Sequence, residues 1–143
     1  GTELTSLQAY AKALGVEDYV TFTGRVSDQQ MLEMLNTADV CVNPDVANEM
    51  NDKSTMNKIM EYMALAKPIV QFDLSEGRFS AQEASLYARR NDTKDLAEKI
   101  LLLLDDQVKR KAMGDFGRNR IITELEWKYE EPKLLEAYRL LFL

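Results

Sequence analysis

Short β-rich runs alternate with amphipathic helical segments along the chain, and this alternation leaves few folds open. The β-rich runs are "YVTFTG" (19–24), "DVCVNP" (39–44) and "IVQFD" (69–73). Helical segments of about a dozen residues separate or follow them. Strands that alternate with helices of this length form βαβ units, in which helices cover both faces of a parallel sheet. We therefore predict an α/β fold with a Rossmann-like parallel sheet.

Capping signals predict where several helices begin and end. Gly15 follows the helical pattern of "LTSLQAYAKAL" and suits a left-handed C-terminal residue. Ser27 with Gln30 has the spacing of a capping box, and Ser80 with Glu83 marks a second helix start before "ASLYA". The remainder is predicted to be helical: "TKDLAEKILLLLDD", "VKRKAMGDFGRNRIITEL", and a last helix from Trp127 with Pro132 in its first turn.

Composition excludes several classes of function. The 143 residues are 45% hydrophobic, enough for one ordinary core, so we predict a single domain over residues 1–143. The net charge is −6 and the basic residues are scattered, which argues against a nucleic-acid partner. The sequence contains no histidine, which removes His-containing metal sites and catalytic triads, and we expect neither a metal nor another cofactor. The single cysteine, Cys41, is predicted to be a buried thiol of a reducing compartment.

Ligands of open parallel sheets bind beyond the carboxyl ends of the strands. Three segments follow predicted strand ends here, namely "TGRVSD", "NPDVANEMNDKST" and "FDLSEGRFS". These segments are the candidate ligand-binding loops.

The helix predicted over residues 54–66 has two distinct faces when projected at about 100° per residue. Its apolar stripe comprises Met56, Ile59, Met60, Met63 and Ala64, and its polar stripe comprises Ser54, Asn57, Lys58 and Glu61. The apolar stripe is predicted to be core. The amide N–H groups of the first turn, Ser54 to Asn57, suit a phosphate, and Glu61 suits the ribose hydroxyls of the same nucleotide. Alternatively, Glu61 only pairs with Lys58 on a solvated helix face.

Three stretches together carry a resemblance to a known family. "VTFTGRVSDQQMLEMLNTADVCVNP", "MNKIMEYMALAKPIVQFD" and "TKDLAEKILLLLDD" follow one another in the expected order. They resemble the C-terminal, donor-binding half of retaining GT-B glycosyltransferases of the group 1 or family 4 type. The resemblance covers essentially the whole chain and implies a nucleotide-sugar-binding domain that lacks the first two strands of the GT-B C-terminal domain.

The resemblance also implies roles for single residues. Glu61 matches the second Glu of a pair separated by seven residues and would bind the ribose of a nucleoside diphosphate sugar. Amides around Asn57 and Lys58 would hold the diphosphate, and Arg25 and Val26 would border the nucleobase. For Arg25 the alternative is an ordinary surface charge.

The sequence departs from the family pattern at the first Glu of the pair, where it has Lys53. A lysine cannot accept hydrogen bonds from sugar hydroxyls. Either Asp52 or Asn51 substitutes, or Lys53 contacts phosphate, or the site is altered. Glu76 and Arg78 also stand at a predicted strand end, where a neutral surface pair is the alternative.

The implied reaction is transfer of a sugar from a nucleoside diphosphate sugar to an acceptor hydroxyl with retention, by a full-length enzyme whose N-terminal domain binds the acceptor. Two alternatives remain: a sugar-nucleotide epimerase of GT-B fold, or a non-enzymatic α/β interaction module. "WKYEEPKLLEAYRLLF" resembles the transferase ending that packs toward the partner domain, or is a closing helix with Leu134, Leu135, Tyr138 and Leu141 as core.

The remaining expectations concern the setting of the chain. Family association implies polysaccharide biosynthesis and a cytoplasmic location, membrane-peripheral in the full-length enzyme. The missing central strands would expose strand edges, through which the chain could oligomerise. We expect the isolated chain to lack transferase activity.

Overall fold

The computed structural model describes residues 3–141. The chain divides into two compact units, one up to Met34 and one from Leu35 onward. The first unit contains α1 (Leu4–Ala13), a short 3-10 helix η1 (Glu17–Tyr19) and the start of α2 (Asp28–Thr37), whose last residues belong to the second unit.

Two predicted helix boundaries of the first unit are confirmed. Gly15 follows α1 with a φ of +66°, the left-handed conformation that glycine adopts without steric cost. The capping box before α2 is formed: the Ser27 N–H donates to Gln30 Oε1 (3.1 Å), and the Gln30 N–H donates to Ser27 Oγ (3.3 Å).

The strand predicted at 19–24 is not formed. Val20 has extended backbone angles (φ −121°, ψ 117°), and Tyr19 is 89% exposed. A strand needs a hydrogen-bonded neighbour, and no segment among residues 3–141 pairs with this run. The run is therefore an extended segment with β-rich composition.

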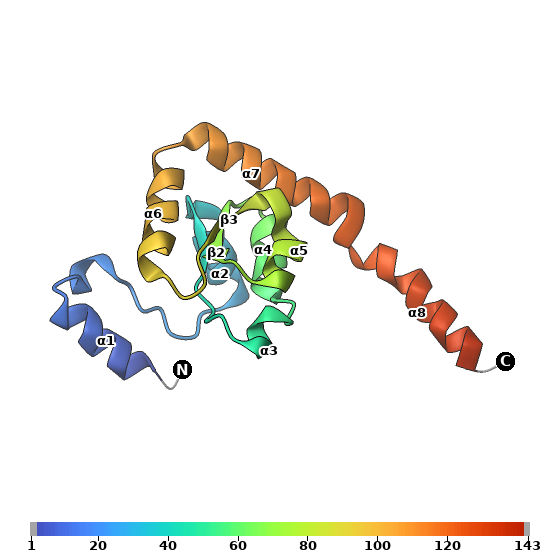
Figure 1. Ribbon diagram of the computed structural model, residues 1–143, viewed down its shortest axis with the longest axis horizontal. Helices are drawn as coiled ribbons and strands as arrows, with labels where there is room; N and C mark the ends of the chain where they lie inside the picture. Colours follow the sequence, from blue (N-terminus) through green and yellow to red (C-terminus); the bar gives the residue numbers. More distant parts are fainter. Residues whose placement is uncertain (1–2, 142–143) are drawn as a thin grey trace. The chain divides into compact units, whose positions relative to one another are not determined.

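The second unit is built on a three-stranded parallel sheet in the order β1-β2-β3 (Figure 1). The strands are β1 (Cys41–Asn43), β2 (Ile69–Phe72) and β3 (Ser85–Ala88). In the register, Asn43 pairs with Gln71, and Gln71 pairs with Tyr87. The predicted parallel sheet is confirmed, and β1 begins at the buried Cys41, whose pKa burial raises to about 11.

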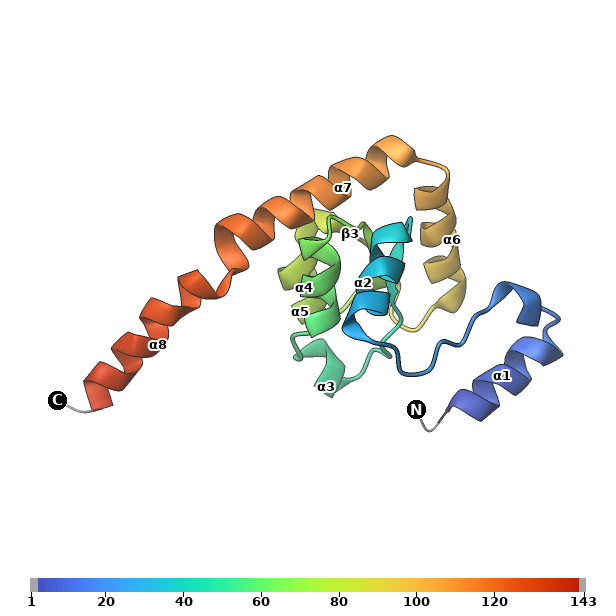
Figure 2. The same ribbon diagram turned by 180° about the vertical axis from the view of Figure 1, so that it is seen from behind.

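Helices cover both faces of this sheet, as the sequence predicts (Figures 1 and 2). On one face, α4 (Asn57–Ala64) and α5 (Ser75–Ala81) enclose a cluster around Ile59, Met63 and Ile69. On the other face, α6 (Thr93–Leu104) and α7 (Gln107–Arg120) pack on a cluster around Val70 and Phe72. The two faces of β2 are therefore both buried, which is typical of a central parallel strand.

The helix start predicted at Ser80 is wrong. Ser80 lies in the last turns of α5, and a 3-10 turn η2 (Gln82–Ala84) leads directly into β3. Gln82 has a φ of +45°, which breaks the helix there. Leu86 and Ala88 then pack in the core beside β2, so burial makes "SLYA" a strand.

The C-terminal segment continues as a π-helical turn η3 (Ile121–Leu125) and α8 (Trp127–Leu141). Pro132 is the sixth residue of α8, beyond the first turn in which it was predicted. α8 extends away from the sheet in both views (Figures 1 and 2). The four residues predicted as its core side are 44–76% exposed, so the closing-helix alternative is wrong for residues 3–141; they are Leu134, Leu135, Tyr138 and Leu141. None of the described helices is long and apolar enough to cross a membrane.

Candidate functional site

The candidate site lies where β1 ends, at the carboxyl edge of the parallel sheet. After Asn43 the chain forms a long loop that contains a short helix, α3 (Glu49–Asp52), and then enters α4. The third predicted loop is different, because α5 begins at Ser75, three residues after β2 ends at Phe72. Loops of the first kind are the usual ligand-binding segments of open parallel sheets.

The helix predicted from Ser54 begins three residues later. Met56 is the N-cap residue, with extended angles (φ −96°, ψ 111°), and its side chain packs against the Ile59 cluster. Ser54 lies outside the helix, where its Oγ donates to the Met50 carbonyl (2.6 Å). The first-turn amides that have no intrahelical acceptor are therefore those of Asn57 and Lys58.

The two faces of α4 are those predicted. Ile59 and Met63 are fully buried, whereas Asn57 and Glu61 are exposed. An amphipathic helix of this kind is fixed by its apolar face, so its polar face is held in a defined orientation.

Glu61 does not pair with Lys58. Lys58 Nζ lies 2.8 Å from Asp45 Oδ2, and both side chains are half-buried. Within residues 3–141, no ion pair or side-chain hydrogen bond involves the Glu61 carboxylate. The carboxylate can therefore accept hydrogen bonds from a ligand without breaking a contact.

Lys53 forms an exposed ion pair with Glu49, with Nζ 2.8 Å from Oε1. The Lys53 side chain is 72% exposed and that of Glu49 is 85% exposed. Such a pair contributes little to stability, so Lys53 can exchange Glu49 for a ligand anion at low cost.

The two neighbours considered as substitutes for the missing Glu are already engaged. Asn51 Nδ2 donates to the Val46 carbonyl (2.9 Å). The Asp52 carboxylate accepts from the Ser75 N–H (2.8 Å) and from Arg90 Nη2 (2.7 Å). The Ser75 N–H, together with Arg90, lowers the pKa of Asp52. Both side chains therefore hold the loop, which leaves Lys53 as the contact that the sequence alternatives still allow.

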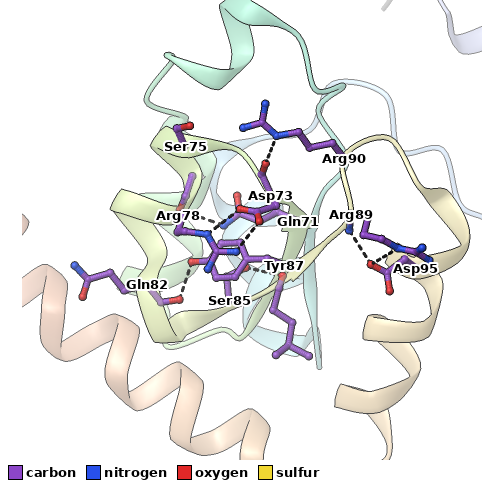
Figure 3. Close-up of polar contacts among 12 residues, drawn as sticks. Gln71, Asp73, Ser75, Arg78, Gln82, Ser85, Tyr87, Arg89, Arg90 and Asp95 are labelled. Carbon is purple, nitrogen blue, oxygen red and sulfur yellow. Dashed lines mark hydrogen bonds and ion pairs between the residues drawn. The ribbon is translucent and has the colours of Figure 1, made fainter.

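Glu76 and Arg78 do not form the surface pair considered as an alternative. Thr55 Oγ1 donates to Glu76 Oε1 (2.7 Å), which links the loop to α5. Arg78 Nε donates to Asp73 Oδ1 (2.8 Å), and its guanidinium lies 4.1 Å from the centre of the Tyr87 ring (Figure 3). The Arg78 hydrogen bond lowers the pKa of Asp73.

A buried polar layer lies under α5 on the same face of the sheet. Gln71 and Asn43, paired in register, are 0% and 1% exposed. Gln71 Nε2 donates to the Gly77 carbonyl (3.3 Å), and a Cβ at Gly77 would lie only 2.6 Å from Gln71 Oε1. Close approach of α5 to β2 therefore requires glycine at this position.

Arg25 and Val26 belong to the first compact unit. Arg25 is exposed and Val26 is half-buried. Their predicted contact with a nucleobase stays a prediction.

Sequence reasoning missed four residues that shape the loop: Asp45, Asp52, Arg90 and Asn91. Arg90 and Asn91 escaped because β3, the strand they follow, was interpreted as a helix. Asp45 stands directly after Pro44 at a predicted strand end, and this position was the available signal for it. No group of three or more His, Cys, Asp or Glu side chains in the described part of the chain is arranged to hold a metal ion.

We expect stability to fall as the pH drops below the ordinary carboxyl range. The pKa values of Asp52, Asp73 and Asp95 are lowered, chiefly by the Ser75 N–H, the Arg78 side chain and the Arg89 N–H respectively. A lowered folded-state pKa contributes stability above the unfolded value of about 3.9 and loses it as the pH falls through the folded value. Urea unfolding at decreasing pH measures this loss. Asp95→Asn should flatten the acid dependence, whereas Glu98→Gln at an exposed position of α6 should leave it unchanged.

Comparison with known proteins agrees with this geometry. Residues 1–106 match the family model described as glycosyl transferases group 1. The chain is 28% identical over 121 residues to a GDP-mannose-dependent monoacylated alpha-(1-6)-phosphatidylinositol monomannoside mannosyltransferase of Corynebacterium glutamicum, covering 82% of this chain and 31% of that protein.

Among solved structures, sucrose-phosphate synthase from Thermosynechococcus elongatus has the same fold, with a TM-score of 0.80 at 22% identity. The match covers 99% of this chain and 35% of the synthase, so the chain spans about a third of the length of each relative. The predicted GT-B type of α/β fold is confirmed by this likeness. Because the family model matches most of its length, the chain belongs to the glycosyl transferases group 1 family.

Proposed function

We propose that this chain is the donor-binding part of a retaining glycosyltransferase, which transfers a sugar from a nucleoside diphosphate sugar to an acceptor hydroxyl. The observation that carries the proposal is the start of α4 after the β1 loop. There the amides of Asn57 and Lys58 precede Glu61, whose carboxylate is exposed and has no partner among residues 3–141. Family membership supports the same assignment.

Each part of a nucleoside diphosphate finds a chemical counterpart in this segment. The first-turn amides and the positive end of the helix dipole suit the diphosphate. Lys53, held only by an exposed pair with Glu49, adds a positive charge beside them in the sequence. Glu61 accepts hydrogen bonds from the ribose hydroxyls. In the transfer step, these groups stabilise the negative charge that develops on the leaving diphosphate.

The partners and setting of the whole protein belong to the same proposal. We infer an N-terminal acceptor domain, because the chain spans about a third of its relatives. A cytoplasmic location fits the single free thiol, Cys41. A cell-envelope glycan as acceptor rests on family association, and a glycolipid acceptor is what the name of the Corynebacterium relative suggests.

The test is a two-dimensional amide NMR titration of the chain with GDP, UDP and ADP. We expect one nucleotide to shift the amides of Asn57 to Glu61, and GDP is tried first because the mannosyltransferase relative depends on GDP-mannose. Arg25 and Val26 should shift with the base that is bound. A dispersed spectrum that ignores all three nucleotides contradicts the proposal and favours an interaction module.

A further inference from the structure

Asn91 lies in the turn between β3 and α6 and reaches the loop that follows β1, 44 residues earlier in the chain. The Ala47 N–H donates to Asn91 Oδ1 (2.7 Å), and Asn91 Nδ2 donates to the Ala47 carbonyl (3.1 Å). The side-chain amide thereby satisfies both backbone groups of one loop residue, as a neighbouring strand would. We call this pair of hydrogen bonds the Asn91 clamp.

The backbone of Asn91 restricts which residue can form the clamp. Its φ is +60°, a left-handed conformation that glycine, asparagine and aspartate adopt most readily. Glycine suits the turn but has no side chain, and ionised aspartate can accept from the Ala47 N–H but cannot donate to its carbonyl. Among these residues only asparagine fits the turn and forms both hydrogen bonds.

Packing beneath this part of the loop is incomplete, so the hydrogen bonds matter for its position. A cavity of about 230 Å³ lies between the loop and the turn, lined by Pro44, Val46, Phe72, Asn91, Thr93 and Leu96. Side chains that do not fill the space between two segments cannot fix the distance between them. The clamp joins the two segments beside this cavity.

Arg90, the neighbour of Asn91, anchors a second point of the same loop. Its Nη2 donates to Asp52 Oδ1 (2.7 Å), and its Nε donates to the Asp73 carbonyl (2.8 Å; Figure 3). The turn after β3 therefore holds the loop at Ala47 and at Asp52. The next residue after Asp52 is Lys53, and α4 begins four residues further on.

We propose that Asn91 is a positioning residue for donor binding. By holding Ala47, it fixes the loop that carries Lys53 and leads to the amides of Asn57 and Lys58. It need not touch the donor itself. This inference rests on the proposed function, and it adds a residue that the family motif around Glu61 does not include.

Asn91→Gly tests the inference, because it removes the amide and leaves the left-handed turn unstrained. Without nucleotide, hydrogen exchange at the Ala47 amide should become at least about tenfold faster, while the amides of Ile59 to Met63 keep their protection. The affinity for the nucleotide that binds the wild-type chain should fall about tenfold, with the amide spectrum still dispersed. Asn91→Asp, which keeps one of the two hydrogen bonds, should lie between.

Ala66→Gly is the matched control, because Ala66 also has a positive φ (55°) but no polar side chain. It should change neither Ala47 exchange nor nucleotide affinity. An Asn91→Gly chain with fast Ala47 exchange and wild-type affinity overturns the positioning role and leaves the donor site intact. A wild-type chain that binds no nucleotide overturns the proposed function, and the positioning role with it, whatever the exchange at Ala47.

Discussion

Glu61→Ala is expected to weaken binding of the recognised nucleoside diphosphate by about 10- to 100-fold. Hydrogen bonds to a charged group contribute about 1.5–3 kcal/mol, and each 1.4 kcal/mol is about tenfold in affinity. The stability of the fold should hardly change, because the Glu61 side chain is exposed and has no partner in the described part of the chain. Calorimetric titration of the wild-type and variant chains measures the difference.

A comparison of nucleotides locates the contact at the ribose. The 2′,3′-dideoxy form of the same nucleoside diphosphate lacks the hydroxyls that Glu61 is proposed to bind. If Glu61 binds them, the dideoxy nucleotide should bind wild type and Glu61→Ala with equal affinity, and Glu61→Gln should be intermediate for the ordinary nucleotide. Glu98→Ala, an exposed glutamate of α6, is the control for a general change in charge. Equal losses for both nucleotides would mean that Glu61 acts elsewhere than at the ribose.

Local signals predicted those parts of the fold that local interactions determine. The capping box of Ser27 and Gln30 joins residues three apart, and the buried stripe of Ile59 and Met63 follows from helical periodicity. Both are present as predicted. The start of α4 was misplaced by three residues because Met56 is held in an extended conformation by core packing, which no local signal reports.

Strands were harder to predict because a strand exists only with a partner. The run at 19–24 has β-rich composition and no pairing among residues 3–141, whereas Ser85–Ala88 follows a helix-like Ser80 and Glu83 spacing and is nevertheless a strand. In the second case, pairing with β2 and burial of Leu86 and Ala88 outweigh the capping signal. Tertiary context decides both outcomes.

The site divides in the same way. The segment from Lys53 to Glu61 is continuous in the sequence, so its pattern could be recognised without a structure. Asp52 and Asn91 act through contacts with Ser75, Arg90 and Ala47, which lie 23 to 44 residues away along the chain. No spacing rule links such residues, and only the folded chain brings them together.

Gly114→Ala is expected to lower the free energy of unfolding by about 3 kcal/mol and the melting temperature by roughly 10 °C. A Cβ at Gly114 of α7 would overlap the carbonyl oxygen of Ala66 and lie 2.8 Å from its carbonyl carbon. Ala66 belongs to the turn between α4 and β2, and its φ of 55° leaves this backbone little freedom to move aside. Thermal and urea unfolding of the variant measure the loss.

Gly117→Ala on the same helix separates a clash with backbone from a clash with side chains. Its Cβ would lie 3.0 Å from the Ala84 Cβ and 3.1 Å from the Met63 Cγ, and the Met63 side chain can adjust. Alanine also has a higher helix propensity than glycine by about 1 kcal/mol, which offsets part of the crowding. Gly117→Ala should therefore cost clearly less than Gly114→Ala. If both variants were equally stable, α7 would not rest on the backbone of the turn after α4, and the packing that holds the donor-binding helix against α7 would be different from the one described.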